Sequence, residues 1–147
     1  MSFTPTQEDV HAFLQDQTHQ HGVLGYLDAE SNPDSAFIGF SATPELGIIF
    51  GTSDTSRKFS RVLENDHVSF NVTDRDSRYT IQLKGIVKEI PKSELEPYEE
   101  AHYAKLGEYS RKFKDMPDQH FFLITPTWLR FSDCSGFPWT VTTLIDK

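Results

Sequence analysis

The hydrophobic positions of this chain form short clusters separated by polar and turn-forming residues, a pattern that predicts many strands and few helices. A helix is expected over residues 6–18, because Val10, Phe13 and Leu14 fall on one helical face and Thr6 precedes them as a cap. Short apolar runs bounded by turn residues then predict strands at residues 22–27, 36–41 and 48–52. The connections between these strands have hairpin lengths, so an antiparallel meander is expected.

The middle of the chain is expected to continue with a helix and two further strands. The helix is predicted over residues 56–64, with Phe59, Val62 and Leu63 as its apolar stripe. Alternating or largely apolar segments predict the two strands at residues 67–72 and 79–90.

The later part of the pattern indicates a second helix and more strands. Gly85 lies inside the long predicted strand, where a glycine often marks a bulge or a barrel corner. A helix is expected over residues 93–106, with Ser93 and Glu96 as a capping box. The remaining strands are expected at residues 120–125 and 127–132, joined across Pro126, with a short further piece in residues 136–144.

These elements together predict a mainly β fold, a small barrel of about six to seven antiparallel strands with inserted helices. No internal repeat or long Pro/Gly/Ser linker divides the 147 residues. A single domain over residues 1–147 is therefore expected, with a helical segment at residues 1–20 and a tail at residues 136–147.

Composition narrows the class of protein. Aromatic residues make up 13% of the chain, which argues against disorder because aromatic side chains supply large buried area. The single cysteine, Cys134, cannot form an internal disulfide and suits a reducing compartment. The N-terminus lacks the basic and apolar regions of a secretory signal, and no apolar run is long enough to span a membrane. We therefore expect a cytoplasmic protein without membrane association.

The charge is unevenly distributed along the sequence. The chain has 14 Lys+Arg against 22 Asp+Glu, a net charge of -8 that disfavours binding to nucleic acid. The first 56 residues contain eight acidic residues and no Lys or Arg. The first cations then occur together, as Arg57, Lys58 and Arg61.

Two of these cations lie where a helix end disfavours them. Arg57 and Lys58 fall in the first turn of the helix predicted at residues 56–64, where the helix dipole is partially positive. A bound phosphate would reverse this cost, because it accepts hydrogen bonds from both cations and from free backbone N–H groups. Nearby hydroxyl donors are available from Thr52, Thr55 and Ser56. The alternative is that the cations pair on a solvated helix face with Asp54, Glu64 or Asp66.

Other residue types that carry chemistry give no convincing site. His19 and His21 lie two positions apart, but no third metal ligand follows at a suitable spacing, so no metal site is expected. The remaining candidates are best explained as structural residues: His67, His102, His120 and Cys134.

The order of these segments resembles the FMN-binding split barrels related to pyridoxamine 5'-phosphate oxidase. The similarity runs from Gly22 to about Asp133, through the Thr-x-x-x-Ser-Arg-Lys of residues 52–58, the long strand at 79–85 and the closing segment at 125–131. It implies a split-barrel fold and a homodimer that binds FMN at the interface between its subunits.

The same resemblance implies where the cofactor is held. Ser56, Arg57 and Lys58 would hold the FMN phosphate, and Gly51 and Thr52 would contact the cofactor at the end of a strand.

The flavin ring has its own implied neighbours. The strand containing Ile38 and Phe40 would run along the ring, and a glutamine on the long strand would fall at Thr80 or Gln82. Trp139 matches an aromatic residue laid near the flavin by the second subunit, with a core or interface tryptophan as the alternative.

The chain also departs from the true oxidase. Residues 38–43 contain no cation, and residues 140–147 lack the basic, histidine-containing motif that holds pyridoxal phosphate. We therefore expect an FMN-dependent oxidoreductase that acts on a small-molecule redox substrate other than pyridoxamine phosphate, with no catalytic acid or base identified. The alternatives are a non-catalytic module that binds flavin, haem or deazaflavin, and an interaction protein with an empty cleft.

Overall fold

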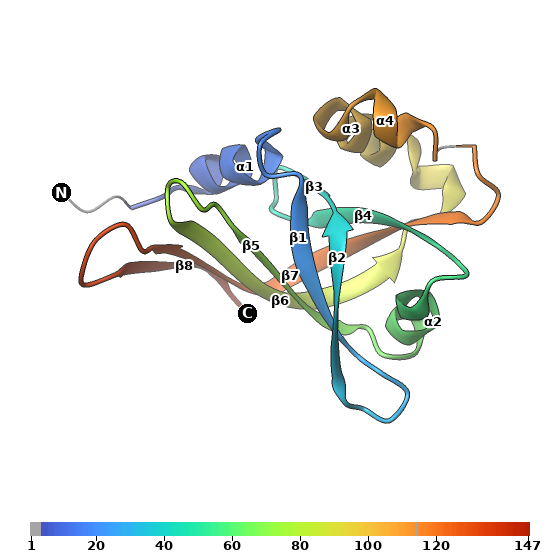
Figure 1. Cartoon of the computed structure of the whole chain (residues 1–147), viewed down its shortest axis with the longest axis horizontal. Coiled ribbons are helices and arrows are strands. Elements are labelled where there is room, and N and C mark those ends of the chain that lie inside the picture. Colours follow the sequence, from blue (N-terminus) through green and yellow to red (C-terminus); the bar gives the residue numbers. More distant parts are fainter. Residues whose placement is uncertain (1–3, 114) are drawn as a thin grey trace.

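The computed structural model describes residues 4–113 and 115–147, which form one curled antiparallel sheet with helices along its rim (Figure 1). The sheet order is β2-β1-β5-β6-β7-β4-β3, and β8 pairs with β7 outside this path. This arrangement confirms the mainly β split barrel that the sequence predicted. The strands are β1 (His21–Leu27), β2 (Pro33–Gly39), β3 (Ser41–Ala42), β4 (Ile48–Ser53), β5 (His67–Thr73), β6 (Tyr79–Glu89), β7 (Gln119–Asp133) and β8 (Thr140–Asp146). The helices are α1 (Gln7–Gln15), α2 (Arg57–Glu64), α3 (Glu96–Leu106) and α4 (Glu108–Arg111).

The first two helices begin where their local signals predict. The Thr6 hydroxyl accepts the backbone N–H of Asp9 at 3.2 Å, and the Asp9 carboxylate accepts the backbone N–H of Thr6 at 2.8 Å. This reciprocal capping box starts α1, which ends at Gln15, slightly earlier than expected. Ser56 is the N-cap residue of α2, although its side chain makes no capping hydrogen bond.

The predicted three-strand meander is wrong beyond its first hairpin. Strands β1 and β2 pair from His21 opposite Gly39 to Leu27 opposite Pro33, but β4 pairs with β7 and β3. The reason lies in three consecutive apolar residues of β4, Ile48, Ile49 and Phe50, all of which are fully buried. A strand that is apolar on both faces needs cover on both sides, which an edge beside β2 does not provide.

The long strand β6 contains the predicted irregularity. Its register with β7 shifts between Lys84 and Gly85, and a Cβ atom on Gly85 would lie only 2.4 Å from the Thr125 carbonyl oxygen. The two strands expected on either side of Pro126 are one continuous strand, β7, in which Pro126 lies opposite Gly85. The proline is tolerated inside the strand because it falls at the bulge.

The second predicted helix begins later than expected. Ser93 lies in a 3-10 turn over Lys92–Glu94, and the capping box that would join Ser93 to Glu96 does not form. Helix α3 starts at Glu96 with Pro97 in its first turn, the position where a missing N–H costs least.

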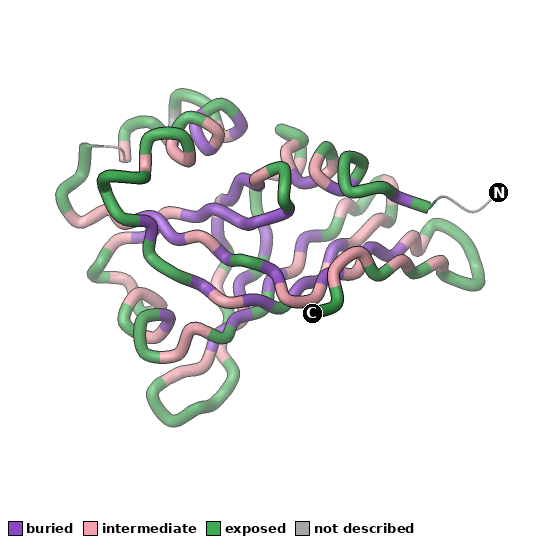
Figure 2. The backbone as a smooth tube through the Cα atoms, turned by 180° about the vertical axis from the view of Figure 1, so that it is seen from behind, coloured by how far each residue is buried: buried purple, intermediate pink, exposed green. Residues whose placement is uncertain are grey.

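The main core fills the interior of the curled sheet, where buried segments of the strands face one another (Figure 2). A smaller cluster lies under α3 and consists of Ile49, Ile90, Tyr103 and Phe121. The stripe predicted for α2 is correct at Val62, which is buried, but Leu63 is 53% exposed. None of the helices in the described part of the chain has the length and apolarity that crossing a bilayer requires.

Candidate functional site

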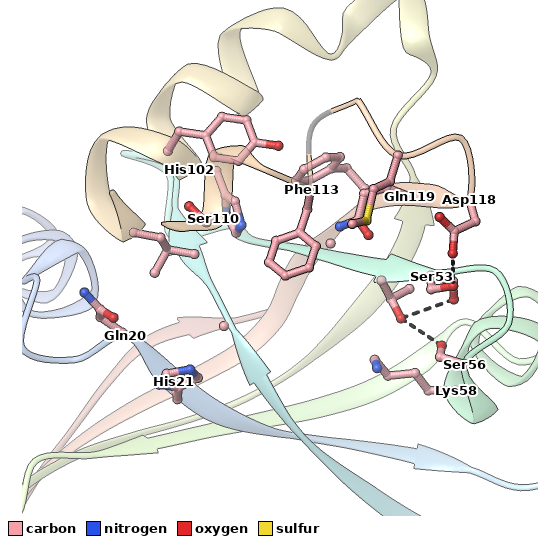
Figure 3. Close-up of a pocket in the computed structure, with 17 residues that line it drawn as sticks. Gln20, His21, Ser53, Ser56, Lys58, His102, Ser110, Phe113, Asp118 and Gln119 are labelled. Atoms are coloured by element: carbon pink, nitrogen blue, oxygen red, sulfur yellow. Dashed lines mark hydrogen bonds between the residues drawn. The ribbon is translucent and has the colours of Figure 1, made fainter. Parts of the chain in front are cut away.

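A pocket of about 550 Å³ lies beneath α3, facing the end of β4 and the start of α2 (Figure 3). The pocket is lined by side chains that are far apart in the sequence. Its walls come from Gln20, His21, Gly39, Gly51, Thr52, Ser53, Ser56, Lys58, His102, Tyr103, Leu106, Ser110, Phe113, Met116, Asp118, Gln119 and Phe121.

Four of the predicted cofactor residues meet at one end of this pocket: Gly51, Thr52, Ser56 and Lys58. The Thr52 and Ser56 hydroxyl oxygens are 2.8 Å apart and share a hydrogen bond, so each still has capacity for a ligand. A Cβ atom on Gly51 would lie 2.3 Å from the side-chain nitrogen of Gln119, so the glycine leaves room for that amide.

The loop that carries these hydroxyls is tied to the start of β7. The Ser53 hydroxyl donates to the Asp118 carboxylate at 2.5 Å, and the Asp54 backbone N–H donates to the Asp118 carbonyl at 2.8 Å (Figure 3). His120 lies between Glu89 at 2.9 Å and Asp54 at 3.3 Å, and hydrogen bonds to these carboxylates raise the pKa of its imidazole. The loop is therefore held at two points before α2 begins.

Lys58 is the unpaired cation of the pocket. Its side chain is half-buried and, within residues 4–113 and 115–147, makes no hydrogen bond or ion pair, while burial lowers the pKa of its ammonium group. The first turn of α2 contains no acidic residue. A partly desolvated ammonium group beside free helix N–H groups is an electrostatically costly arrangement that a bound anion would relieve.

Arg57, the neighbouring residue, is directed away from the pocket. Its side chain is 80% exposed and forms an ion pair with Asp34 on β2, which also accepts a hydrogen bond from Tyr26 at 3.2 Å. The Ser35 backbone N–H and the Arg57 guanidinium hold the pKa of the Asp34 carboxyl below its usual range. The structure therefore brings Ser56 and Lys58 to the pocket without Arg57.

The opposite end of the pocket contains a buried histidine that lies on α3. The His102 Nδ1 atom is 2.9 Å from the Ser41 hydroxyl oxygen, and its ring packs edge-on against Phe121 with centroids 5.4 Å apart. Burial, assisted by the nearby Lys105, lowers the pKa of His102 to about 4, so the imidazole is neutral at physiological pH.

Lys105 is a second buried cation on the same helix, outside the pocket lining. Its ammonium nitrogen lies 3.4 Å from the centre of the Phe40 ring and has no hydrogen-bond partner in the described part of the chain. Burial lowers the pKa of Lys105 to about 7.

The other predicted ring-contacting residues lie elsewhere. Ile38 and Phe40 are buried in the barrel core, and it is Gly39 between them that reaches the pocket wall. Gln82 and Trp139 line a groove of about 590 Å³ on the outer face of the sheet. This outer groove is lined by Asn71, Thr73, Asp74, Arg75, Arg78, Thr80, Gln82, Arg130, Ser132, Cys134, Trp139 and Val141.

Sequence reasoning missed the contribution of α3 to the pocket. The sequence explains His102 as a structural residue, and its position on one side of the predicted helix with Leu106 does not distinguish a structural role from a place in the pocket wall. Among the described residues no group of three or more His, Cys, Asp or Glu is arranged to hold a metal ion. His19 contacts the Phe13 carbonyl and Asp74, whereas His21 stacks on Phe37.

Comparisons with known proteins identify the family to which this architecture is related. The model of the pyridoxamine 5'-phosphate oxidase family matches residues 6–133. Among curated protein sequences, none matches this chain.

Solved structures share the fold at low sequence identity. A heme binding protein from Mycobacterium smegmatis has a TM-score of 0.76 and 15% identity over 97% of this chain, which spans only 60% of that protein. A pyridoxamine 5'-phosphate oxidase-related, FMN binding protein from Nostoc punctiforme has a TM-score of 0.71 and 14% identity, covering 98% of this chain and 99% of that one. An F420 reductase has a TM-score of 0.67 and 18% identity, covering 86% and 98% of the two chains.

Proposed function

This chain belongs to the pyridoxamine 5'-phosphate oxidase family, and we propose that it binds FMN in the pocket beneath α3 and acts as an FMN-dependent oxidoreductase. The observation that carries the proposal is Lys58, an unpaired and half-buried cation at the start of a helix whose first turn has no acidic residue. A phosphate monoester is the ligand group that would offset both features.

The rest of this pocket end fits a phosphate-bearing cofactor. The Thr52 and Ser56 hydroxyls lie 2.8 Å apart beside Lys58, and Ser53 is already used by Asp118. The volume of about 550 Å³ falls in the range of pockets that enclose small ligands. Lys58, Thr52 and Ser56 would hold the phosphate, with the free N–H groups of the first α2 turn.

We further propose that the protein is a homodimer in which the outer groove of one subunit covers the pocket of the other. Five large apolar side chains are exposed on the strands or the tail beside this face: Val23 at 44%, Phe37 at 73%, Phe137 at 97%, Trp139 at 65% and Val141 at 48%. Exposed apolar surface of this kind is typical of an interaction site. In such a dimer, Gln82 and Trp139 would approach the cofactor from the partner subunit.

When bound, the flavin would supply the redox chemistry, and the protein would orient the ring and control access to it. The substrate is a small molecule, and pyridoxamine phosphate is disfavoured because residues 38–43 contain no cation to hold a second phosphate. A cytoplasmic location is part of the same proposal, since the lone Cys134 suits a reducing compartment.

The proposal is tested by comparing Lys58→Ala with Arg57→Ala as a matched control. Loss of one charge-assisted contact to phosphate, about 1.5–3 kcal/mol, should weaken FMN binding by roughly 10- to 100-fold in Lys58→Ala. Binding of riboflavin, which lacks the phosphate, should change little in either variant. Fluorescence titration measures both ligands. Equal loss of FMN and riboflavin affinity in Lys58→Ala would contradict the phosphate assignment.

Haem binding is a second candidate, because two histidines, His21 and His102, line the same pocket. Imidazole nitrogens are common axial ligands of haem iron. The visible spectrum of the purified protein separates the two candidates, since bound haem gives a Soret band and bound FMN gives a flavin spectrum and releases FMN on heating.

A further inference from the structure

The hydrogen bond between Ser41 and His102 determines where the imidazole carries its proton. Ser41 is fully buried on β3, and its hydroxyl has one hydrogen bond in the described part of the chain, to His102 Nδ1 at 2.9 Å. If Nδ1 carried the proton, the buried hydroxyl hydrogen would have no acceptor, which is costly for a desolvated group. The satisfied arrangement has the Ser41 hydroxyl donating to Nδ1, so the neutral ring carries its proton on Nε2.

The Nε2–H group is a neutral donor at the pocket. His102 lines the pocket, whereas Ser41 does not, and Figure 3 shows the imidazole extending from α3 toward the cavity. The pKa of His102, lowered by burial to about 4, keeps the ring uncharged throughout the physiological range. It therefore offers a hydrogen bond without the positive charge that Lys58 supplies at the other end.

The surroundings of His102 favour an uncharged ligand group. The charged lysine and aspartate of the pocket, Lys58 and Asp118, lie toward the β4–α2 end (Figure 3). The wall that α3 and the following segment provide consists of uncharged residues, which are Tyr103, Leu106, Ser110, Phe113 and Met116. An anionic group would be poorly solvated there, whereas a flat apolar ring with a hydrogen-bond acceptor would be satisfied.

We propose, on the premise that the pocket binds FMN, that His102 donates a hydrogen bond from Nε2 to a carbonyl oxygen of an uncharged ring held beneath α3. Ser41 is a positioning residue that acts through His102 by fixing its tautomer. A neutral imidazole N–H is suited to polarise a carbonyl group. The carbonyl belongs either to the flavin ring or to a second, uncharged planar substrate, and the two sources are separated below.

The first arm of the test needs no ligand. Nitrogen NMR of the ¹⁵N-histidine-labelled protein should show His102 as the Nε2–H tautomer between pH 6 and 8, without titration in that range. Ser41→Ala should remove the tautomer preference, whereas His67→Ala, which changes an exposed histidine, should leave the His102 signals in place. A Nδ1–H tautomer in the natural protein, or titration of His102 near pH 6.5, would overturn the proposal.

The second arm measures binding to His102→Ala and to His102→Gln, which retains a side-chain N–H donor. The probes are riboflavin for the ligand-free protein, and 1,4-naphthoquinone or naphthalene for the FMN-loaded protein. Loss of one neutral hydrogen bond should weaken a carbonyl ligand by about five- to tenfold in His102→Ala. His102→Gln should restore part of the affinity, and naphthalene, which has no carbonyl, should bind all variants alike.

The pattern of losses identifies the source of the carbonyl. Loss confined to riboflavin assigns it to the flavin ring, and loss confined to naphthoquinone assigns it to the second substrate. Unchanged affinity for both, or an equal loss for naphthalene, would overturn the proposal. Failure of the natural protein to bind FMN would instead contradict the proposed function, while the tautomer of the ligand-free protein would still be measured independently.

Discussion

The pocket beneath α3 and the outer groove differ in how their polar groups are used, although their volumes of about 550 and 590 Å³ are similar. In the pocket, Lys58 has no partner among the described residues. In the outer groove, Arg130 donates to the Gln82 side-chain oxygen at 2.7 Å, and Thr80 bonds Thr73 at 2.8 Å. The pocket thus retains binding capacity for a small anionic group. In the groove several polar side chains pair with one another, although the buried Arg130 Nε atom has no hydrogen-bond partner in the described part of the chain.

The apolar side chains of the two regions differ in their exposure to solvent. Tyr103 on α3 and Phe121 on β7 are buried in the pocket wall, while Trp139 and Val141 in the groove are 65% and 48% exposed. Pockets lined by buried apolar side chains are typical of ligand sites, whereas exposed apolar side chains are typical of surfaces that bind another protein. This difference supports our proposal that the two regions are two halves of one site, supplied by different subunits.

The largest effect is expected when two variants are mixed. This experiment distinguishes an FMN site that is shared between two subunits from a site that is built within one subunit. Lys58→Ala removes the pocket cation and Trp139→Ala removes the groove aromatic, so each homodimer should bind FMN poorly. Random exchange of subunits makes half of the dimers mixed, and each mixed dimer has one intact site, so about a quarter of the FMN sites should recover. Equilibrium dialysis of FMN against the equimolar mixture measures the recovery. Binding that stays at the level of the separate variants would argue for sites built within one subunit.

A second prediction concerns the buried lysine of α3, for which the groove offers a matched control. The pKa of Lys105 falls from 10.5 to about 7 in the fold because burial disfavours its charge. Below pH 7 both folded and unfolded chains carry the charge, and the folded state bears the full desolvation cost. Between about pH 7 and 10.5 the unfolded chain binds more protons, so stability should rise with pH across that range.

Lys105→Met should therefore stabilise the protein by about 1–3 kcal/mol below pH 7, the cost of a buried polar group without a partner. This gain should shrink as the pH rises toward 10.5. Arg75→Met, which changes an exposed cation of the groove, should show no such pH dependence. Urea denaturation at several pH values measures both variants, and a pH-independent gain would show that Lys105 is not desolvated.

The smallest effect is expected at the loop that leads into the pocket. Carboxylates of Glu89 and Asp54 raise the pKa of His120, so its stabilising contribution is present below pH 6.5 and lost as the pH rises through the elevated folded pKa. His120→Gln should lower the melting temperature at pH 5.5 and leave it nearly unchanged at pH 8.5. His67→Gln, at an exposed histidine away from this loop, is the control. A loss of equal size at both pH values would indicate a packing role for the ring, which also contacts Phe59.

Much of the fold could be predicted because its signals are local. The capping residues Thr6 and Asp9 identify the start of α1, and Gly85 correctly identifies the bulge in β6. The position of β4 could not be predicted, because hairpin-length connections favour sequential pairing. The burial of Ile48 and Ile49 on opposite faces decides instead that β4 lies between β7 and β3.

In the candidate site, too, features set by neighbouring residues could be predicted, whereas features set by residues far apart in the sequence could not. The residue types alone were enough to single out the loop and helix start that contain Thr52, Ser56 and Lys58 as a candidate phosphate site, and the structure places these three residues in one pocket. The contribution of His102 could not be predicted, because its partner Ser41 is 61 positions earlier in the chain and only the packing of α3 on β3 joins them. The residues around a histidine in the sequence do not show whether its ring lines a cavity or is enclosed by the core.

The sequence by itself determined that two adjacent cations, Arg57 and Lys58, would open a helix after a hydroxyl-rich loop. Only the tertiary structure decided which of them serves the pocket. Consecutive residues point about 100° apart around a helix, so the two side chains leave α2 in different directions. Burial of Val62 fixes the rotation of α2, which turns Lys58 toward the pocket and Arg57 toward Asp34.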